Sequence, residues 1–160
     1  MNWLLLRGLA RETRHWGNFP NIIQKTLKSK KVIALDLPGS GIENQREVPL
    51  SIAEMVQDVR TRFLAQAQPG EEWGVLSISM GGMLALQWCA EFPTDFTRAV
   101  LINSSAKKIC SIFERLNPAA FQTITKALFN KSALKREELI LKATSSFHQD
   151  NQTLAQEWSN

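Results

Sequence analysis

The stretch from Glu72 to Pro93 constrains the fold more than any other part of the chain. An apolar run, Trp73 to Ile78, ends at Ser79, and the pair Gly81-Gly82 and a helix-like apolar segment follow at once. This order predicts a buried strand, a very sharp turn and a helix. A turn this tight leaves no room for a side chain two residues after its apex, which explains Gly81, and it lifts the Ser79 hydroxyl clear of the backbone.

Ser79 therefore has the position of a nucleophile. A helix that begins directly after it adds unpaired amides and the positive end of a dipole, so the Met80 amide could hold a developing oxyanion. An ordinary strand-to-helix turn, with Gly81-Gly82 present only for packing, explains the same residues, and short motifs of this kind often match by chance. This stretch alone leaves both interpretations open.

Charge and cysteine usage narrow the class of protein. Residues 1–106 carry eleven Lys and Arg against ten Asp and Glu, and residues 107–160 carry eight against five, which gives net charges of +1 and +3. A surplus this small suits a solvated helical surface better than a nucleic-acid footprint, which would need basic residues clustered on one face. Cys89 and Cys110 show no paired spacing, which is typical of reduced thiols in the cytoplasm.

Targeting, metal and cofactor signals are also missing from the sequence. The apolar opening Trp3–Leu6 is too short for a signal peptide, and no later run has the length of a membrane span. The glycines at 39 and 41 do not fit a dinucleotide fingerprint, because no third glycine follows at the required spacing. We therefore predict a cytoplasmic protein with no membrane or nucleic-acid partner, no cofactor and no metal.

Strand and helix signals alternate along the first two thirds of the chain. The predicted strands are 2–7, 31–36, 73–78 and 97–103. The first predicted helix is 16–28, and the second is capped by Ser51 and Glu54 and ended by residues 68–70. The third lies between the sharp turn at Ser79 and Phe92-Pro93. This alternation is typical of an α/β fold, a parallel sheet of about four strands with flanking helices.

Three segments in this order resemble the alpha/beta-hydrolase family. Ser77-Ile78-Ser79-Met80-Gly81 resembles the Gly-Xaa-Ser-Xaa-Gly nucleophile elbow, with Ser77 for the first glycine. Arg7-Gly8-Leu9-Ala10 is similar to the family's oxyanion turn, with Arg7 for the usual histidine, and residues 36–41 match Asp-Xaa-Pro-Gly-Xaa-Gly. The resemblance covers residues 1–106 and implies that the strands lie in the spatial order second, first, third, fourth.

The resemblance also implies roles for particular residues. Ser79 would attack a carboxylic ester or thioester of a small molecule, and the amides of Met80 and Leu9 would hold the oxyanion. Asp36 is expected to hold its turn. From the residues alone, Arg11, Arg14 and His15, together with Arg7, could contact an anionic substrate group at the mouth of the site, although a solvated loop is the simpler interpretation of that segment.

Residues 107–160 resemble the helical lid that many members of this family insert after the corresponding strand. Short helices with apolar faces are expected, broken at Pro118 and around Asn130. Such faces usually serve packing, but a lid that places phenylalanines near the elbow would suit an acyl or other apolar group. The residues concerned are Ile109, Ile112, Phe113, Leu116, Phe121, Ile124, Leu128, Phe129, Leu139 and Ile140.

One departure from the family pattern is larger than these matches. The family's acid and histidine follow the nucleophile on later strands, and no later acid or histidine here follows a recognisable strand. The residues concerned are Glu91, Asp95, Glu114, Glu137, Glu138, Asp150, Glu157 and His148. The sequence is therefore expected to be the N-terminal part of a hydrolase or a natural truncation, inactive alone; a non-catalytic binding module and a base supplied by His148 are the alternatives.

The last predicted strand has a consequence for association. Residues 99–102, Ala-Val-Leu-Ile, would form an apolar sheet edge with no strand beyond it. We expect self-association through this edge, or its coverage by the helical segment.

Overall fold

The computed structural model describes residues 1–9, 11–106, 118–145 and 150–159. The chain forms two compact units, Met1–Ala106 and Lys107–Asn160. Each unit has its own helices, and the first holds the whole sheet.

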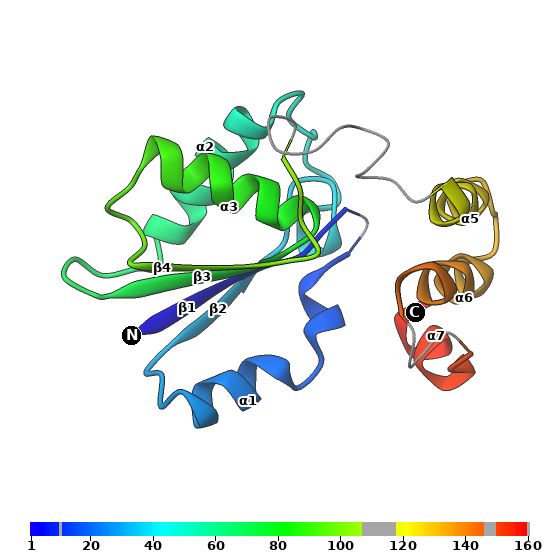
Figure 1. The fold of residues 1–160 in the computed structure, drawn as a ribbon, viewed down its shortest axis with the longest axis horizontal. Coiled ribbons are helices and arrows are strands. Elements are labelled where there is room, and N and C mark those ends of the chain that lie inside the picture. Colours follow the sequence, from blue (N-terminus) through cyan, green and yellow to red (C-terminus); the bar gives the residue numbers. More distant parts are fainter. Residues whose placement is uncertain (10, 107–117, 146–149, 160) are drawn as a thin grey trace. The chain divides into compact units, whose positions relative to one another are not determined.

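The first unit is built on a four-stranded parallel sheet (Figure 1). Its strands are β1 (Asn2–Leu6), β2 (Val32–Leu35), β3 (Trp73–Ile78) and β4 (Arg98–Ile102). Their spatial order, β2-β1-β3-β4, confirms the order implied by the family resemblance. All four strands point the same way, so their carboxyl ends meet at one edge of the sheet, where ligands bind in folds of this kind.

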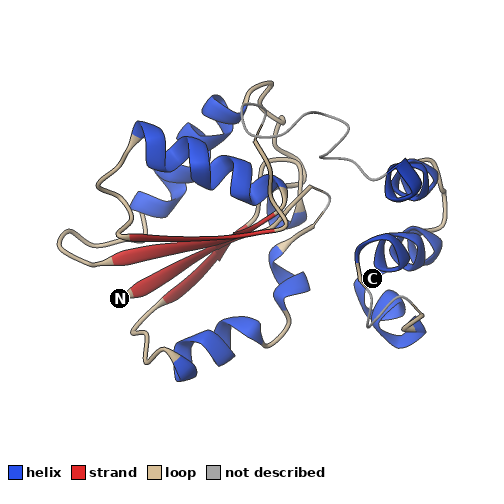
Figure 2. Ribbon diagram, viewed as in Figure 1, coloured by secondary structure: helices blue, strands red, loops and turns tan. Residues whose placement is uncertain are grey.

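Helices cover both faces of this sheet (Figure 2). Helices α2 (Ile52–Leu64) and α3 (Met80–Glu91) lie on one face, and α1 (Phe19–Thr26) lies on the other. Two short 3-10 helices, η1 (Thr13–Trp16) and η2 (Gly41–Glu43), lie in the loops that follow β1 and β2. The α/β class predicted from the sequence is confirmed.

The core on the α2/α3 face is aromatic. Phe63 lies at its centre, with ring centroids 5.0 Å from Trp73, 5.6 Å from Trp88 and 5.5 Å from Phe96. Asp95 supports this cluster from its rim, because it accepts a hydrogen bond from Trp88 Nε1 at 2.8 Å and pairs with Arg60 at 2.6 Å. These contacts fix α3 against the sheet and so fix the residue that precedes it.

Helix boundaries follow local signals. The predicted capping box is confirmed, since the Glu54 amide donates to Ser51 Oγ and the Ser51 amide donates to the Glu54 carboxylate. The first helix begins at Phe19 and not near Trp16, because Gly17 adopts φ 51°, which is incompatible with a right-handed helix at that position. Pro20 then occupies the first turn of α1, where its missing N–H costs no hydrogen bond.

Strand β4 forms an open edge of the sheet. Within the described residues it pairs only with β3, and Val100, Leu101 and Ile102 are 36–39% exposed. The expected apolar edge is therefore present in the first unit.

The second unit contains helices α5 (Pro118–Leu128), α6 (Ala133–Thr144) and α7 (Gln152–Ser159). The starts of α5 and α6 agree with the predicted breaks at Pro118 and near Asn130. Of the predicted apolar residues, Phe129 is largely exposed, whereas Ile109, Ile112, Phe113 and Leu116 lie outside the described residues. No helix in the described part of the chain is both long and apolar enough to cross a bilayer.

Candidate active site

Ser79 lies at the point where β3 becomes α3, at the carboxyl edge of the sheet. It is exposed, and its backbone adopts φ 55° and ψ −118°, a region that non-glycine residues rarely occupy. Strain of this kind costs about 1–3 kcal/mol and persists only where the surroundings enforce it. The strained turn presents the Ser79 side chain to solvent beyond the end of the strand.

Backbone hydrogen bonds hold Ser79 in this conformation. Its N–H donates to the carbonyl oxygen of Ile102 at 2.9 Å, and its own carbonyl oxygen accepts from the Gly82 amide at 2.9 Å. The Ser104 hydroxyl donates to the same carbonyl oxygen at 2.8 Å. Residues at and just after the end of β4 therefore form hydrogen bonds with both the N–H and the carbonyl group of Ser79.

Two glycines allow the end of β1 to approach the elbow. A Cβ atom at Gly81 would lie 2.6 Å from the carbonyl oxygens of both Leu6 and Arg7. A Cβ atom at Gly8 would lie 3.0 Å from Ser79 Cβ and 3.4 Å from Ser79 Oγ. The turn at Gly8 is therefore directly beside the Ser79 side chain.

Two amides, those of Met80 and Leu9, belong to the segments that meet at Ser79. Met80 is the first residue of α3, so its N–H has no acceptor within the helix. Leu9 follows Gly8 and is 67% exposed, and its N–H donates to no described residue. These are the two amides proposed from the sequence, and both belong to segments that meet at Ser79.

Ser77 replaces the glycine expected two residues before the apex. It is fully buried, and its hydroxyl donates to the carbonyl oxygen of Val100 at 3.3 Å. The substitution therefore adds a bond between β3 and β4, and the elbow forms without a glycine at this position.

The residues predicted to contact an anion lie around η1, where Arg14 is exposed and pairs with Glu12. Arg7 places its guanidinium 4.8 Å from the ring centroid of Trp16. Burial, and to a smaller extent the neighbouring charge of Arg11, lowers the pKa of Arg7 to about 10, so it remains cationic at pH 7. Arg11 and His15 are buried, which makes the solvated-loop interpretation wrong for both; His15 Nδ1 accepts from the Glu12 amide at 3.0 Å.

Asp36 joins the loops that surround the site. Its buried carboxylate accepts from the Thr13 amide and from the Ile42 amide, the latter at 3.1 Å, and its backbone carbonyl accepts from Arg62 at 2.9 Å. This one side chain therefore links η1 to η2, which confirms the structural role expected for it.

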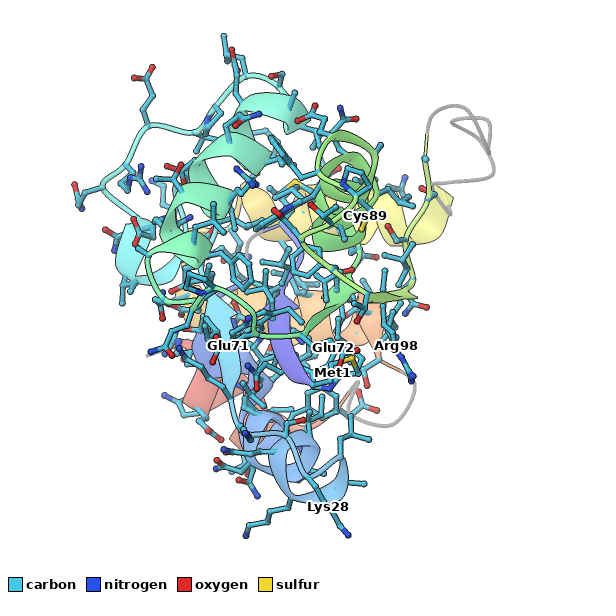
Figure 3. All side chains as sticks on the ribbon, turned by 90° about the vertical axis from the view of Figure 1, so that its left-hand side faces the viewer. Met1, Lys28, Glu71, Glu72, Cys89 and Arg98 are labelled. Atoms are coloured by element: carbon cyan, nitrogen blue, oxygen red, sulfur yellow. The ribbon has the colours of Figure 1, made fainter. Side chains whose placement is uncertain are left out.

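Among the described residues, no side chain forms a hydrogen bond with the Ser79 hydroxyl. Cys89 follows Ser79 by ten residues along α3, which places it about 15 Å away at 1.5 Å per residue and toward the end of the sheet where Met1, Glu72 and Arg98 lie (Figure 3). His15 is the only histidine among the described residues, because His148 lies outside them. The described residues contain no group of three potential metal ligands.

Ser104 is a positioning residue that the sequence did not reveal, since its contact with Ser79 joins positions 25 residues apart. We predict that Ser104→Ala slows phosphonylation of Ser79 by a fluorophosphonate about fivefold, because the strained carbonyl loses one bond worth about 1 kcal/mol. The rate is measured by intact-protein mass spectrometry.

Thr61→Ala is the matched control for this substitution. It removes a hydroxyl-to-carbonyl hydrogen bond of the same 2.8 Å length, but on α2. A labelling rate that falls equally in both variants would show that general destabilisation, and not the position of Ser79, is responsible.

Comparisons with known proteins agree with this geometry. A family model described as "alpha/beta hydrolase fold" matches residues 4–157. A comparison with curated protein sequences found no match.

Solved structures share the fold at low sequence identity. A 2-hydroxy-6-oxo-6-phenylhexa-2,4-dienoate hydrolase from Rhodococcus sp. strain RHA1 is 21% identical with a TM-score of 0.66, over 99% of this chain and 58% of that one. A lipase-esterase related protein from Clostridium acetobutylicum ATCC 824 is 17% identical with a TM-score of 0.66, over 98% and 59%. Est816, described as an N-acyl homoserine lactone degrading enzyme, is 17% identical with a TM-score of 0.67, over 99% and 57%. The chain thus spans little more than half the length of these structures.

Proposed function

The chain belongs to the alpha/beta-hydrolase family, and we propose that it acts as a serine hydrolase on a carboxylic ester or thioester of a small molecule, with Ser79 as the nucleophile. The observation that carries this proposal is the exposed, strained Ser79 beside the turn at Gly8. Three similar solved structures support this proposal by their names: a hydrolase, a lipase-esterase related protein and an N-acyl homoserine lactone degrading enzyme. Such names favour chemistry at an acyl carbonyl group.

The proposed reaction uses one hydroxyl and two amides of this chain. Ser79 Oγ bonds to the substrate carbonyl carbon while its proton passes to a base, and the amides of Met80 and Leu9 donate to the oxyanion. The ester C–O or thioester C–S bond then breaks, and the leaving group takes the proton back from the base. Water hydrolyses the acyl-Ser79 bond and regenerates the hydroxyl.

The reaction also needs a general base and an acid that orients it. We assign neither group to residues 1–106. We propose that they come from other sequence, and that the 160-residue chain alone turns over slowly or not at all. His148 is the candidate within the chain, and ester hydrolysis by His148→Ala compared with the parent tests it; equal rates would discard that role. Residues 107–160 are proposed to act as the lid over an apolar acyl group, and the protein is proposed to work in the cytoplasm.

Fluorophosphonate labelling of the folded chain tests the proposal. A site that keeps its oxyanion amides but lacks its base retains about 10³-fold catalysis over water, so Ser79 should be labelled well above every other serine, and faster when imidazole is added as a base. Peptide mapping identifies the labelled residue. Labelling of Ser79 no faster than in the urea-denatured chain, with or without imidazole, would favour the alternative of a non-catalytic binding module.

The open edge at β4 leads to a separate proposal, self-association of the chain. The exposed Val100 and Ile102 lie on a strand whose outer side pairs with no other strand among the described residues, and such edges pair with other strands. We predict concentration-dependent dimers by sedimentation, and Val100→Lys is expected to shift the chain to monomer.

Leu64→Lys provides the matched control for that prediction. It places the same charge at an exposed apolar position on α2, away from the edge, and should leave the dimers unchanged. A parent chain that stays monomeric at all concentrations would rule out association through β4.

A further inference from the structure

We propose that Arg7, with Arg11 beside it, forms a subsite for an anionic group of the substrate, a carboxylate or a phosphate, next to the oxyanion turn. The substrate would then be an ester or thioester that carries a negative charge. This inference rests on the proposed function of Ser79 for the reaction, but the subsite itself is argued from the surroundings of Arg7.

The Arg7 guanidinium lies over an aromatic ring. Its central carbon lies 4.8 Å from the centroid of Trp16, and Trp16 in turn stacks on Phe19 with centroids 5.3 Å apart and an interplanar angle of 13°. This cation–π contact helps to hold the guanidinium beside Trp16. Within the described residues, the buried Nε atom of Arg7 has no hydrogen-bond partner.

The charge of Arg7 is not balanced within the described part of the chain. No described carboxylate forms an ion pair with it, and the charge that acts on it is the like charge of Arg11. The partly buried arginines of α2 behave differently, since Arg60 pairs with Asp95 and Arg62 pairs with Asp58. Arg7 is half-buried and its Nε atom is fully buried. Because charges withdrawn from water are normally paired, the unbalanced Arg7 supports an anion from outside as the missing partner.

The place of Arg7 in the chain connects this cation to the reaction. Arg7 directly precedes Gly8, and the Arg11 amide donates to the Gly8 carbonyl oxygen at 3.3 Å to close the turn. The Leu9 amide therefore lies between the two arginines in sequence and in the same turn. The planar donor fork of arginine matches carboxylate and phosphate oxygens, which defines the class of group that the subsite would bind.

Binding to the Ser79→Ala chain tests this subsite without any reaction at Ser79. Monomethyl succinate, dimethyl succinate and methyl phosphate are titrated at constant ionic strength and followed by calorimetry. We expect at least one of the two anions to bind about tenfold more tightly than the neutral diester, as befits a charge-assisted bond of roughly 1.4 kcal/mol or more. The anion that binds more tightly identifies the group as a carboxylate or a phosphate.

Arg7→Gln should abolish this preference, and Arg7→Lys should reduce it because the planar fork is lost. The matched control is Arg14→Gln, which removes a cation that already pairs with Glu12 in the same loop and should keep the preference. Equal affinities for the anions and the diester, or equal losses in Arg7→Gln and Arg14→Gln, would overturn the subsite. If Arg7→Gln fails to fold by circular dichroism, the Arg7→Lys and parent comparisons decide.

The two proposals fail in different experiments. If Ser79 is not labelled but anions still bind preferentially, the proposed hydrolase function is rejected and the anion subsite is kept. Labelling of Ser79 without anion preference would do the reverse.

Discussion

Replacing Ser79 by alanine is expected to abolish covalent labelling by fluorophosphonates, and Ser79→Gly is expected to do so while raising the stability of the fold. Loss of the nucleophile alone costs about 10⁶-fold in turnover in a complete serine hydrolase. Glycine adopts φ 55° without penalty, whereas alanine keeps the strain. Ser79→Gly should therefore exceed Ser79→Ala in free energy of unfolding by about 1 kcal/mol or more.

Urea denaturation of the two variants and the parent measures this difference. Equal stability of the glycine and alanine variants would show that Ser79 is not strained in solution, and would contradict a strained turn that presents its hydroxyl as a nucleophile. Persistent labelling in Ser79→Ala would move the reactive hydroxyl elsewhere.

Gly81→Ala is expected to destabilise the protein by about 3 kcal/mol or more, the upper part of the range for overpacking. The new methyl group would lie 2.6 Å from two backbone carbonyl oxygens at the end of β1, and backbone atoms cannot rotate away. Either α3 moves off the sheet or the turn at Gly8 moves away from Ser79. Urea denaturation and the labelling rate together measure both effects.

Gly82→Ala offers a contrast that checks this reasoning. A Cβ atom there would lie 2.5 Å from Ser104 Cβ and 2.3 Å from Ser104 Oγ, which belong to a side chain and not to the backbone. The second substitution Ser104→Gly should therefore restore most of the stability lost in Gly82→Ala, and it should restore none in Gly81→Ala. Rescue of both, or of neither, would contradict the close contacts on which the two predictions rest.

Much of the first unit could be predicted from the sequence because its signals are local. The run Trp73–Ile78, the capping box at Ser51 and the glycines around Ser79 each specify their own backbone. Strand order followed from the family resemblance and was correct.

The environment of the arginines could not be predicted in this way. Polar residues in sequence suggested a solvated loop, but Trp16 and the carboxylate of Asp36 fold the segment around η1 onto the sheet. Likewise, the bond from Ser104 to Ser79 depends on β4 lying beside β3, and no sequence pattern specifies it. Burial and long-range hydrogen bonds are properties of the tertiary structure, so they become visible only in three dimensions.

The hydrogen bonds from the end of β4 to the backbone of Ser79 connect this edge strand to the position of the Ser79 hydroxyl. Ile102 and Ser104 hold the backbone of Ser79, and among the described residues no strand pairs with the outer side of β4. A polypeptide that adds a strand there would therefore also restrict the motion of the Ser79 hydroxyl. Binding free energies of this kind are reciprocal, so a ligand captured at Ser79 should in turn tighten the added strand. Strand addition at β4 is thus expected to change the reactivity of Ser79, and ligand binding at Ser79 is expected to change the affinity for the added strand.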